Sequence, residues 1–356
     1  MLKARKCVRE MREYHSPLSD PSIDLRLDMN ESTTGCSPRV LAKLNSMDAR
    51  TLAQYPRREA GEKLAADFLG VAPQQLLLTN GADEAIDLLC RAYLEPENEI
   101  LIVVPTFGMY EVFAQMENSK IVRVPTGPEF SFPVQRVLDA LSEKTRIVVI
   151  CNPNNPTGVD VPRSDILQVI EAAPGAAILL DEAYFDFYGQ TMIDQIGKLP
   201  NLFVARTFSK AYGLAGLRLG VIAGDQEQMS VLRRMASPFN VNAFAMECLA
   251  EALADRQFVA SYVVQVVTSR EWLRNELEQL NFKCWPSHGN FILCQFGEEK
   301  RAILEALRAR GIALRDRPDC EGCVRITIGK QQEMERLMAE LKQMLSHLPA
   351  SKQVAR

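Results

Sequence analysis

The sequence has little histidine, no long apolar run and no marked excess of either charge. Only three of its 356 residues are histidines: His15, His288 and His347. A histidine-rich metal site is therefore excluded, and no metal is expected. No stretch approaches the ~18 consecutive apolar residues of a membrane span. Lysine plus arginine (41) nearly balance aspartate plus glutamate (45), which argues against a nucleic-acid-binding protein.

Cysteine is present but follows no disulfide pattern. The nine cysteines are odd in number and dispersed, which is typical of a reducing compartment. The N-terminal segment has basic residues but lacks the apolar stretch of a secretory signal, so a cytoplasmic protein is expected. Cys320 and Cys323 have the spacing of half a zinc site, but no second pair follows, and we interpret them as structural.

The distribution of apolar residues predicts an α/β fold. About two domains are expected from the length. Short apolar segments alternate with helical patterns, as in a mostly parallel sheet covered by helices on both faces. The seven expected strands span residues 75–79, 100–104, 120–124, 146–150, 177–180, 202–207 and 219–223.

A second, smaller α+β domain is expected after the long helical segment 258–280, which would connect the two. It would contain strands at 290–295 and 324–328 and helices at 299–310 and 331–348. The expected division is an N-terminal arm with part of the small domain (1–45), a large domain (46–255) and a small C-terminal domain (256–356).

Polar segments follow several of the predicted strands, and ligands bind at this edge of open parallel sheets. The segments are Gly81–Glu84, Asn155–Gly158, Asp181–Tyr184 and Thr207–Lys210. A helix that begins after a glycine is a ready anion site, and an arginine can add a second anion contact. A lysine, a phosphate pocket and an aspartate together suit pyridoxal phosphate, because the lysine forms the Schiff base and the aspartate pairs with the pyridinium nitrogen.

The segment from Thr207 to Gly220, TFSKAYGLAGLRLG, resembles the lysine motif of fold-type I, class I/II aminotransferases. More narrowly, it is similar to that of histidinol-phosphate aminotransferases. The resemblance extends from Tyr14 to Gly329, with five motifs in the family's order. It implies pyridoxal 5'-phosphate as cofactor, a homodimer, and a large domain with a mostly parallel seven-stranded sheet beside a smaller α+β domain.

The resemblance also implies roles for the cofactor-binding residues. Lys210 would form the Schiff base and shuttle protons, and Asp181 would pair with the pyridine nitrogen. Tyr184 and Asn155 would hydrogen-bond the phenolate oxygen of the ring, and Phe107 would stack on the ring. The phosphate group would be held by Ala82, Asp83, Thr207, Ser209 and Arg218.

Further residues match positions that bind substrate or reach another subunit. Arg325 corresponds to the arginine that clamps the substrate α-carboxylate, and Asn30 lies near the same carboxylate. Tyr14 and Arg315 match residues that hold the substrate phosphate in histidinol-phosphate enzymes. Tyr55 matches the tyrosine that reaches across a dimer to the neighbouring cofactor phosphate.

Three departures from the family pattern leave the amino donor open. Tyr14 lacks its flanking proline and glycine, the usual Asn-Glu-Asn-Pro reads Asn-Glu-Ser-Thr from residue 30, and the loop between Arg315 and Arg325 is short. The expected reaction converts histidinol phosphate and 2-oxoglutarate into imidazole-acetol phosphate and glutamate. The alternatives are an aromatic aminotransferase, a threonine-phosphate decarboxylase, and a non-enzymatic binding module, the last disfavoured because Lys210, Asp181 and Arg325 are all present.

Overall fold

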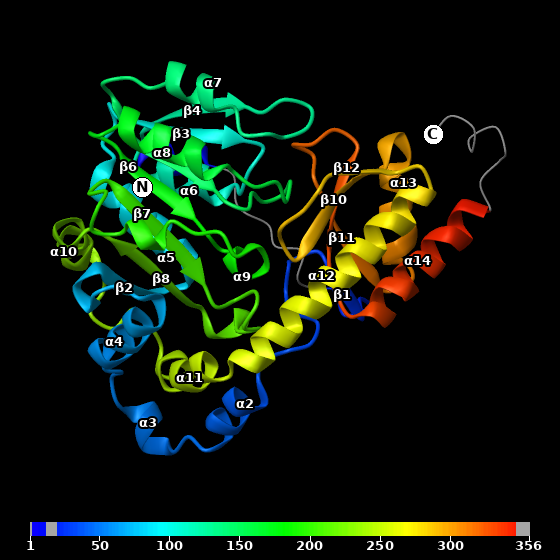
Figure 1. The fold of residues 1–356 in the computed structure, drawn as a ribbon, viewed down its shortest axis with the longest axis horizontal. Helices are drawn as coiled ribbons and strands as arrows, with labels where there is room; N and C mark the ends of the chain where they lie inside the picture. The colour runs from blue at the N-terminus through cyan, green and yellow to red at the C-terminus, as the bar shows by residue number, and fades with distance from the viewer. Residues whose placement is uncertain (1, 12–19, 347–356) are drawn as a thin grey trace.

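The computed structural model describes residues 2–11 and 20–346, and it contains two sheets joined by a long helix (Figure 1). The larger sheet has seven strands and the smaller has five. Helix α12 (Arg256–Gln279) runs from the larger body to the smaller sheet. Tyr14, a predicted substrate residue, lies outside the described residues.

The seven-stranded sheet has the order β2-β8-β7-β6-β5-β3-β4. Strand β8 is antiparallel to β2 and β7, and the other neighbours are parallel, so the prediction of a mostly parallel seven-stranded sheet is confirmed. The strands are β2 (Leu76–Asn80), β3 (Glu99–Val104), β4 (Lys120–Pro125), β5 (Thr145–Cys151), β6 (Ala177–Asp181), β7 (Leu202–Thr207) and β8 (Leu219–Gly224).

Helices cover both faces of this sheet, which explains its near-continuous apolar strands. Along β5, Ile147 and Val149 pack with one group of helices, whereas Val148 and Ile150 pack with another, as the alternation of strand side chains requires. The first group comprises α5 (Gly81–Tyr93), α6 (Met109–Met116) and α10 (Gln226–Met235). The second comprises α7 (Val134–Asp139) and α8 (Arg163–Ala172).

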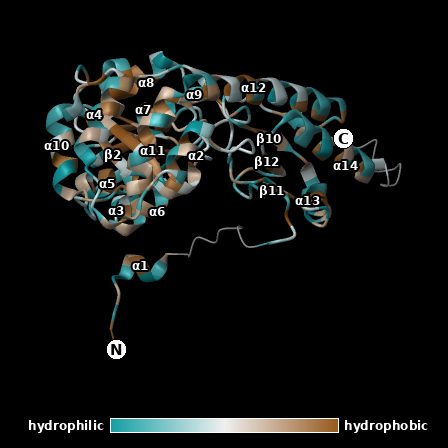
Figure 2. Cartoon of the chain, turned by 90° about the horizontal axis from the view of Figure 1, so that it is seen from below, coloured by the Kyte–Doolittle hydropathy of each residue, from teal (hydrophilic) through white to brown (hydrophobic). Residues whose placement is uncertain are grey.

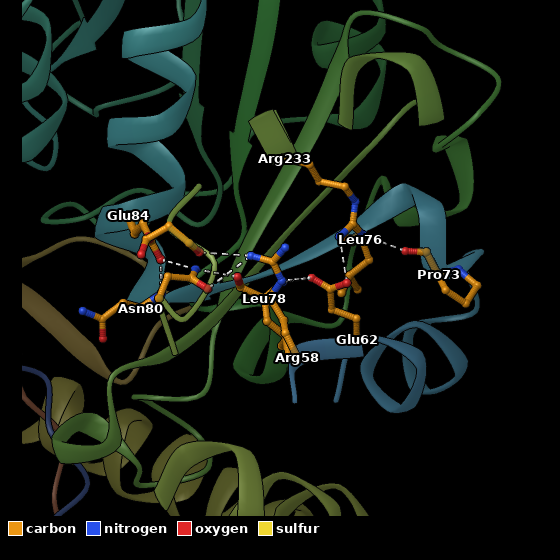
Figure 3. A network of polar contacts seen from close by, with 10 residues as sticks. Arg58, Glu62, Pro73, Leu76, Leu78, Asn80, Glu84 and Arg233 are labelled. Atoms are coloured by element: carbon orange, nitrogen blue, oxygen red, sulfur yellow. Dashed lines mark hydrogen bonds and ion pairs between the residues drawn. The ribbon is translucent and has the colours of Figure 1, made fainter. Parts of the chain in front are cut away.

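Side chains pair with the backbone of β2, the edge strand beside β8 (Figure 3). The Leu78 amide donates to Glu62 Oε1 at 3.4 Å, and the Leu78 carbonyl accepts from Asn240 Nδ2 at 2.9 Å. Arg233 donates to the Leu76 carbonyl and forms an ion pair with Glu62. Asn240 also donates to Glu84 Oε2 at 2.7 Å in the first turn of α5. The network therefore satisfies backbone groups along the outer edge of β2 and fixes the start of α5 beside it.

The five-stranded sheet has the order β1-β11-β12-β10-β9. Strand β1, from the N-terminal part of the chain, pairs in parallel with β11, and the other pairs are antiparallel. Helices α12, α13 (Lys300–Arg308) and α14 (Gln331–Ser346) contribute to the core beside it. The strands are β1 (Leu25–Leu27), β9 (Lys283–Cys284), β10 (Phe291–Gln295), β11 (Ile312–Asp316) and β12 (Cys323–Thr327).

The remaining α-helices lie on the side of the larger sheet, and α1 stands apart from the others in Figure 2. They are α1 (Lys6–Glu10), α2 (Pro38–Asn45), α3 (Ala49–Ala53), α4 (Arg58–Leu69), α9 (Phe185–Tyr188) and α11 (Ala243–Ala254). As its sequence predicts, α4 ends at Gly70, which adopts a positive φ of 73°. Across residues 2–11 and 20–346, no helix is both long and apolar enough to cross a membrane.

Candidate active site

The residues singled out from the sequence gather where the parallel strands end. Asp181 is the last residue of β6 and Thr207 the last of β7. Asn155 follows β5, and Phe107 follows β3. The antiparallel β8 starts at this same edge, directly after Arg218. The C-terminal edge of the sheet thus carries residues that are far apart in the sequence.

Asp181 is a buried carboxylate. Its Oδ2 accepts from the Tyr110 hydroxyl at 2.5 Å, and its Oδ1 accepts from the Ala183 amide at 3.0 Å. Burial raises the pKa of Asp181, and the negative charges of Asp83 and Glu182 add to this effect. A buried carboxylate beside other acids is stabilised in its charged form by a cationic partner. The site therefore favours a ligand that presents a positive charge here.

Lys210 provides an amine at the same edge. Its Nζ donates to the Met29 carbonyl at 3.2 Å. Burial lowers the pKa of Lys210 to about 8, and the positive charge of Arg325 contributes in the same direction. A larger fraction of this amine is neutral near pH 7 than for an ordinary lysine, which makes it a better nucleophile.

The start of α5 forms one side of an anion pocket. No side chain caps this helix at Asn80, so its first-turn N–H groups are not taken by a cap. The backbone at Gly81 lies close to Arg218 and to Gly220. A Cβ added to Gly81, whose φ is 75°, would lie 2.5 Å from Arg218 NH2, and one added to Gly220 would lie 2.6 Å from the Gly81 carbonyl carbon. Only glycine permits this approach, which leaves the helix terminus open to an anion.

Hydroxyl groups and a guanidinium complete the anion pocket. Thr207 Oγ1 donates to Ser209 Oγ at 2.9 Å, and Arg218 NH1 lies 3.5 Å from the same oxygen. Arg218 NH2 pairs with Asp83 at 3.0 Å. With Ala82 in the first turn of α5, these residues are the five predicted to hold a phosphate group.

Arg325 is a buried guanidinium on β12. Its NH1 donates to Asn155 Oδ1 at 2.7 Å, and its NH2 donates to the Asp28 carbonyl at 2.5 Å. Its Nε is buried and has no hydrogen-bond partner within the described part of the chain. Burial lowers the pKa of Arg325 to about 10. An arginine with an unused donor in a buried site is suited to bind an anionic ligand.

Tyr184 and Asn30 are joined directly. The Tyr184 hydroxyl accepts from Asn30 Nδ2 at 2.8 Å, and both residues are buried. Burial raises the pKa of Tyr184 to about 12, so its hydroxyl keeps its proton at neutral pH. The Tyr184 ring packs edge-on against Phe291 at a centroid distance of 4.9 Å.

Three further residues were predicted to bind the cofactor or the substrate, and each has different neighbours in the structure. Phe107 packs edge-on against Tyr110 at 5.6 Å. Arg315 lies opposite Arg325 across the β11–β12 pair. Tyr55 is 77% exposed and stacks on Phe239 at 4.2 Å, so the structure does not bring it into this cluster within one chain.

Several residues of this region were not predicted from the sequence. Tyr110 hydrogen-bonds Asp181 but is separated from it by 71 positions. Glu182 and Arg206 form a buried ion pair at 2.8 Å that links the residue after Asp181 with the one before Thr207. Glu182 and Arg206 could have been predicted, because each is a charged residue at the end of an apolar strand and lies next to a predicted site residue.

The fold and the site define an aminotransferase, and comparisons with known proteins agree. A family model described as aminotransferase class I and II matches residues 22–341, and the chain belongs to this family. The chain is similar to the histidinol-phosphate aminotransferase of Dehalococcoides mccartyi, at 33% identity over 90% of each chain. It is 36% identical to that of Cytophaga hutchinsonii, over 89% of this chain and 90% of the relative.

A solved structure shares the fold. The histidinol-phosphate aminotransferase from Sinorhizobium meliloti, in complex with pyridoxal-5'-phosphate, superposes with a TM-score of 0.90 at 22% identity. The comparison covers 98% of this chain and 99% of that one. The predicted fold is therefore confirmed, and the family match shows that the chain is an aminotransferase.

The residues present fit pyridoxal 5'-phosphate, the cofactor of this class. Lys210 offers the amine, and the buried Asp181 calls for a cation such as a protonated ring nitrogen. The uncapped start of α5, with Gly81 in close contact with Arg218, offers backbone N–H groups and a guanidinium to a phosphate group.

Proposed function

We propose that this protein transfers the amino group of histidinol phosphate to 2-oxoglutarate, forming imidazole-acetol phosphate and glutamate in histidine biosynthesis. The observation that carries the proposal is the arginine pair formed by Arg325 and Arg315 on adjacent strands. The proposed reaction has two anionic substrates, a phosphate ester and a dicarboxylate, and two neighbouring arginines can bind their anionic groups. The similarity to curated histidinol-phosphate aminotransferases over nine-tenths of the chain supports the same substrate.

Each residue of the cluster has a role in this proposal. Bound pyridoxal phosphate supplies an electron sink for the carbon that loses its proton. Lys210 binds the cofactor and its Nζ then moves the proton at the substrate carbon. Asp181 holds a proton on the ring nitrogen, while Tyr184 and Asn155 donate to the ring oxygen. Phe107 stacks on the ring.

The anionic groups are assigned to separate donors. We assign the cofactor phosphate to Ala82, Asp83, Thr207, Ser209 and Arg218. Arg325 binds the α-carboxylate of glutamate or 2-oxoglutarate, with Asn30 nearby. Arg315 and Tyr14 hold the phosphate of histidinol phosphate.

A panel of amino donors tests the substrate assignment. With 2-oxoglutarate as acceptor, kcat/KM for histidinol phosphate is expected to exceed that for phenylalanine by about 100-fold or more, because buried polar groups reject a substrate that leaves them unpaired. Arg315→Gln is expected to lower the value for histidinol phosphate and to leave phenylalanine nearly unaffected. A preference for phenylalanine would indicate an aromatic aminotransferase, and carbon dioxide release from phosphothreonine without a keto acid would indicate a decarboxylase.

We propose further that the chain forms a homodimer in which Tyr55 reaches the cofactor phosphate of the neighbouring subunit. Tyr55 is too exposed to belong to the core, and it stacks on another exposed aromatic ring, that of Phe239. Exposed apolar residues of this kind mark interaction surfaces when they lie together. Further exposed apolar residues occur on α2, α3 and α11, namely Leu41, Leu52 and Phe244. The odd, dispersed cysteines support a cytoplasmic location for this dimer.

Mixed dimers test whether the active site is shared. Tyr55→Ala and Lys210→Ala subunits are each expected to be impaired alone. A hybrid dimer restores one complete site if Tyr55 acts across the interface, so mixing and reassembly should recover activity well above that of either variant. No recovery in a hybrid whose formation is verified by tagged purification would refute the shared site.

A further inference from the structure

A fully buried chain of hydrogen bonds extends from Tyr184 to the small sheet. Asn30 Nδ2 donates to the Tyr184 hydroxyl at 2.8 Å, and Thr327 Oγ1 donates to Asn30 Oδ1 at 3.0 Å. Asn290 Nδ2 donates to the Asn30 carbonyl at 3.1 Å. The side chains of Asn30, Thr327 and Asn290 are inaccessible to solvent. The side-chain groups of Asn30 and Thr327 are paired with each other and with Tyr184, and buried polar groups that are paired in this way specify one arrangement.

Asn30 is held in an uncommon backbone conformation. Its φ is 54°, in the left-handed region that non-glycine residues seldom adopt. The Asn30 amide donates to Thr327 Oγ1 at 2.9 Å, so Thr327 binds both the backbone and the side chain of Asn30. Such a conformation persists where its surroundings determine it, and it is often found at functional sites.

The contacts of Thr327 determine which way the Asn30 amide faces. Its hydroxyl accepts from the Asn30 backbone and donates its one hydrogen to Oδ1. The NH2 group of Asn30 is therefore turned toward Tyr184, and the Tyr184 oxygen acts as the acceptor. The hydrogen of Tyr184 is then free to point toward another acceptor.

We propose that Thr327 is a positioning residue that, through Asn30, makes Tyr184 a hydrogen-bond donor to the ring oxygen of the cofactor. This inference rests on the proposed function. A hydrogen-bond donor at the ring oxygen stabilises the negative form of that oxygen. The proton that lies between the ring oxygen and the nitrogen of Lys210 is then held less tightly, so the pKa for its loss from the bound cofactor falls. Without the Thr327 hydroxyl, the Asn30 amide can reverse and compete for the Tyr184 hydrogen.

Among the described residues, the hydroxyl of Thr327 hydrogen-bonds only Asn30 and none of the other titratable groups of the site. The groups that affect the pKa of Tyr184 or of Lys210 come from several elements, and a substitution at Thr327 removes none of them. They are Glu31, Asp83, Cys151, Asp181, Arg218 and Arg325.

A spectroscopic titration tests the proposal. Thr327→Val removes the hydroxyl but keeps a branched side chain, and Thr327→Ser keeps the hydroxyl. The pKa of the bound cofactor is obtained by following how the long-wavelength absorbance of the cofactor-loaded protein changes with pH. Thr327→Val is expected to raise this pKa by up to about one unit, whereas Thr327→Ser should stay near the wild-type value. Thr327→Ala removes the same hydroxyl and carries the same expectation should the valine variant not fold.

A double variant separates this role from general damage to the fold. Thr327→Val is expected to add no further shift in a Tyr184→Phe background, because both changes act through one hydrogen bond. An unchanged pKa in Thr327→Val, or an equal shift on both backgrounds, would overturn the inference while the proposed function stands. A wild-type protein without the absorbance band would overturn the proposed function and this inference with it.

Discussion

Replacing Lys210 by alanine is expected to lower the rate of transamination by about 10³-fold or more, because the variant loses both the nucleophile and the general acid–base group. The pKa of about 8 means that the amine of Lys210 is partly neutral near physiological pH. Cofactor uptake by the cofactor-free protein requires this neutral form. Its rate should therefore rise with pH through about 8 and then level off.

Borohydride reduction gives a direct measurement of the Lys210 bond. The treated wild-type protein should carry the cofactor on the peptide that contains Lys210, and Lys210→Ala should carry none. Lys198 lies on the surface, and Lys198→Ala serves as the matched control, with labelling and activity expected to equal those of the wild type. Labelling that survives in Lys210→Ala would contradict the assignment.

Replacing Asp181 by asparagine is expected to lower kcat by about 10²- to 10³-fold, the usual cost of losing one preorganised electrostatic contact. The buried carboxylate would keep the ring nitrogen protonated, and a neutral amide would not. Asparagine retains an oxygen that can accept from the Ala183 amide, which lies 3.0 Å from Asp181 Oδ1, and its NH2 group can donate to the Tyr110 hydroxyl, so the local geometry should survive.

Steady-state kinetics and cofactor absorbance together separate this effect from misfolding. The Asp181→Asn variant should bind the cofactor yet turn over slowly, with an altered absorbance spectrum. Asp67→Asn, a change at an exposed position of α4, should leave both measurements unchanged. An Asp181→Asn protein with wild-type kcat would show that the carboxylate is not needed at the ring.

The sequence predicted the large sheet well because its signals are local. Strands such as β3 and β7 are short apolar runs, and their ends are marked by Pro105 and by Ser209. Strand β11 was not predicted. Its sequence Ile-Ala-Leu-Arg-Asp has no clear alternation, and its partner β1 lies almost 290 positions away, as the pairing of Leu25 with Ile312 shows. Pairing between such distant segments depends on tertiary packing, which no short window of sequence records.

The site was predictable to the extent that its residues follow strands. Asp181 and Lys210 were found in this way, and the structure places both at one edge of the sheet. Tyr110 and Thr327 were not found, because their importance lies in partners that are distant in the sequence, Asp181 and Asn30. The individual roles of the site residues, the division into domains and the dimer stay predictions.

The half-reaction with histidinol phosphate tests the central claim most directly. Cofactor-loaded protein is mixed with histidinol phosphate in the absence of any keto acid, and the absorbance of the bound cofactor is followed. The long-wavelength band is expected to disappear as one imidazole-acetol phosphate forms per active site, and added 2-oxoglutarate is expected to restore the band and to release glutamate. A band that persists with histidinol phosphate but disappears with an aromatic amino acid would contradict it.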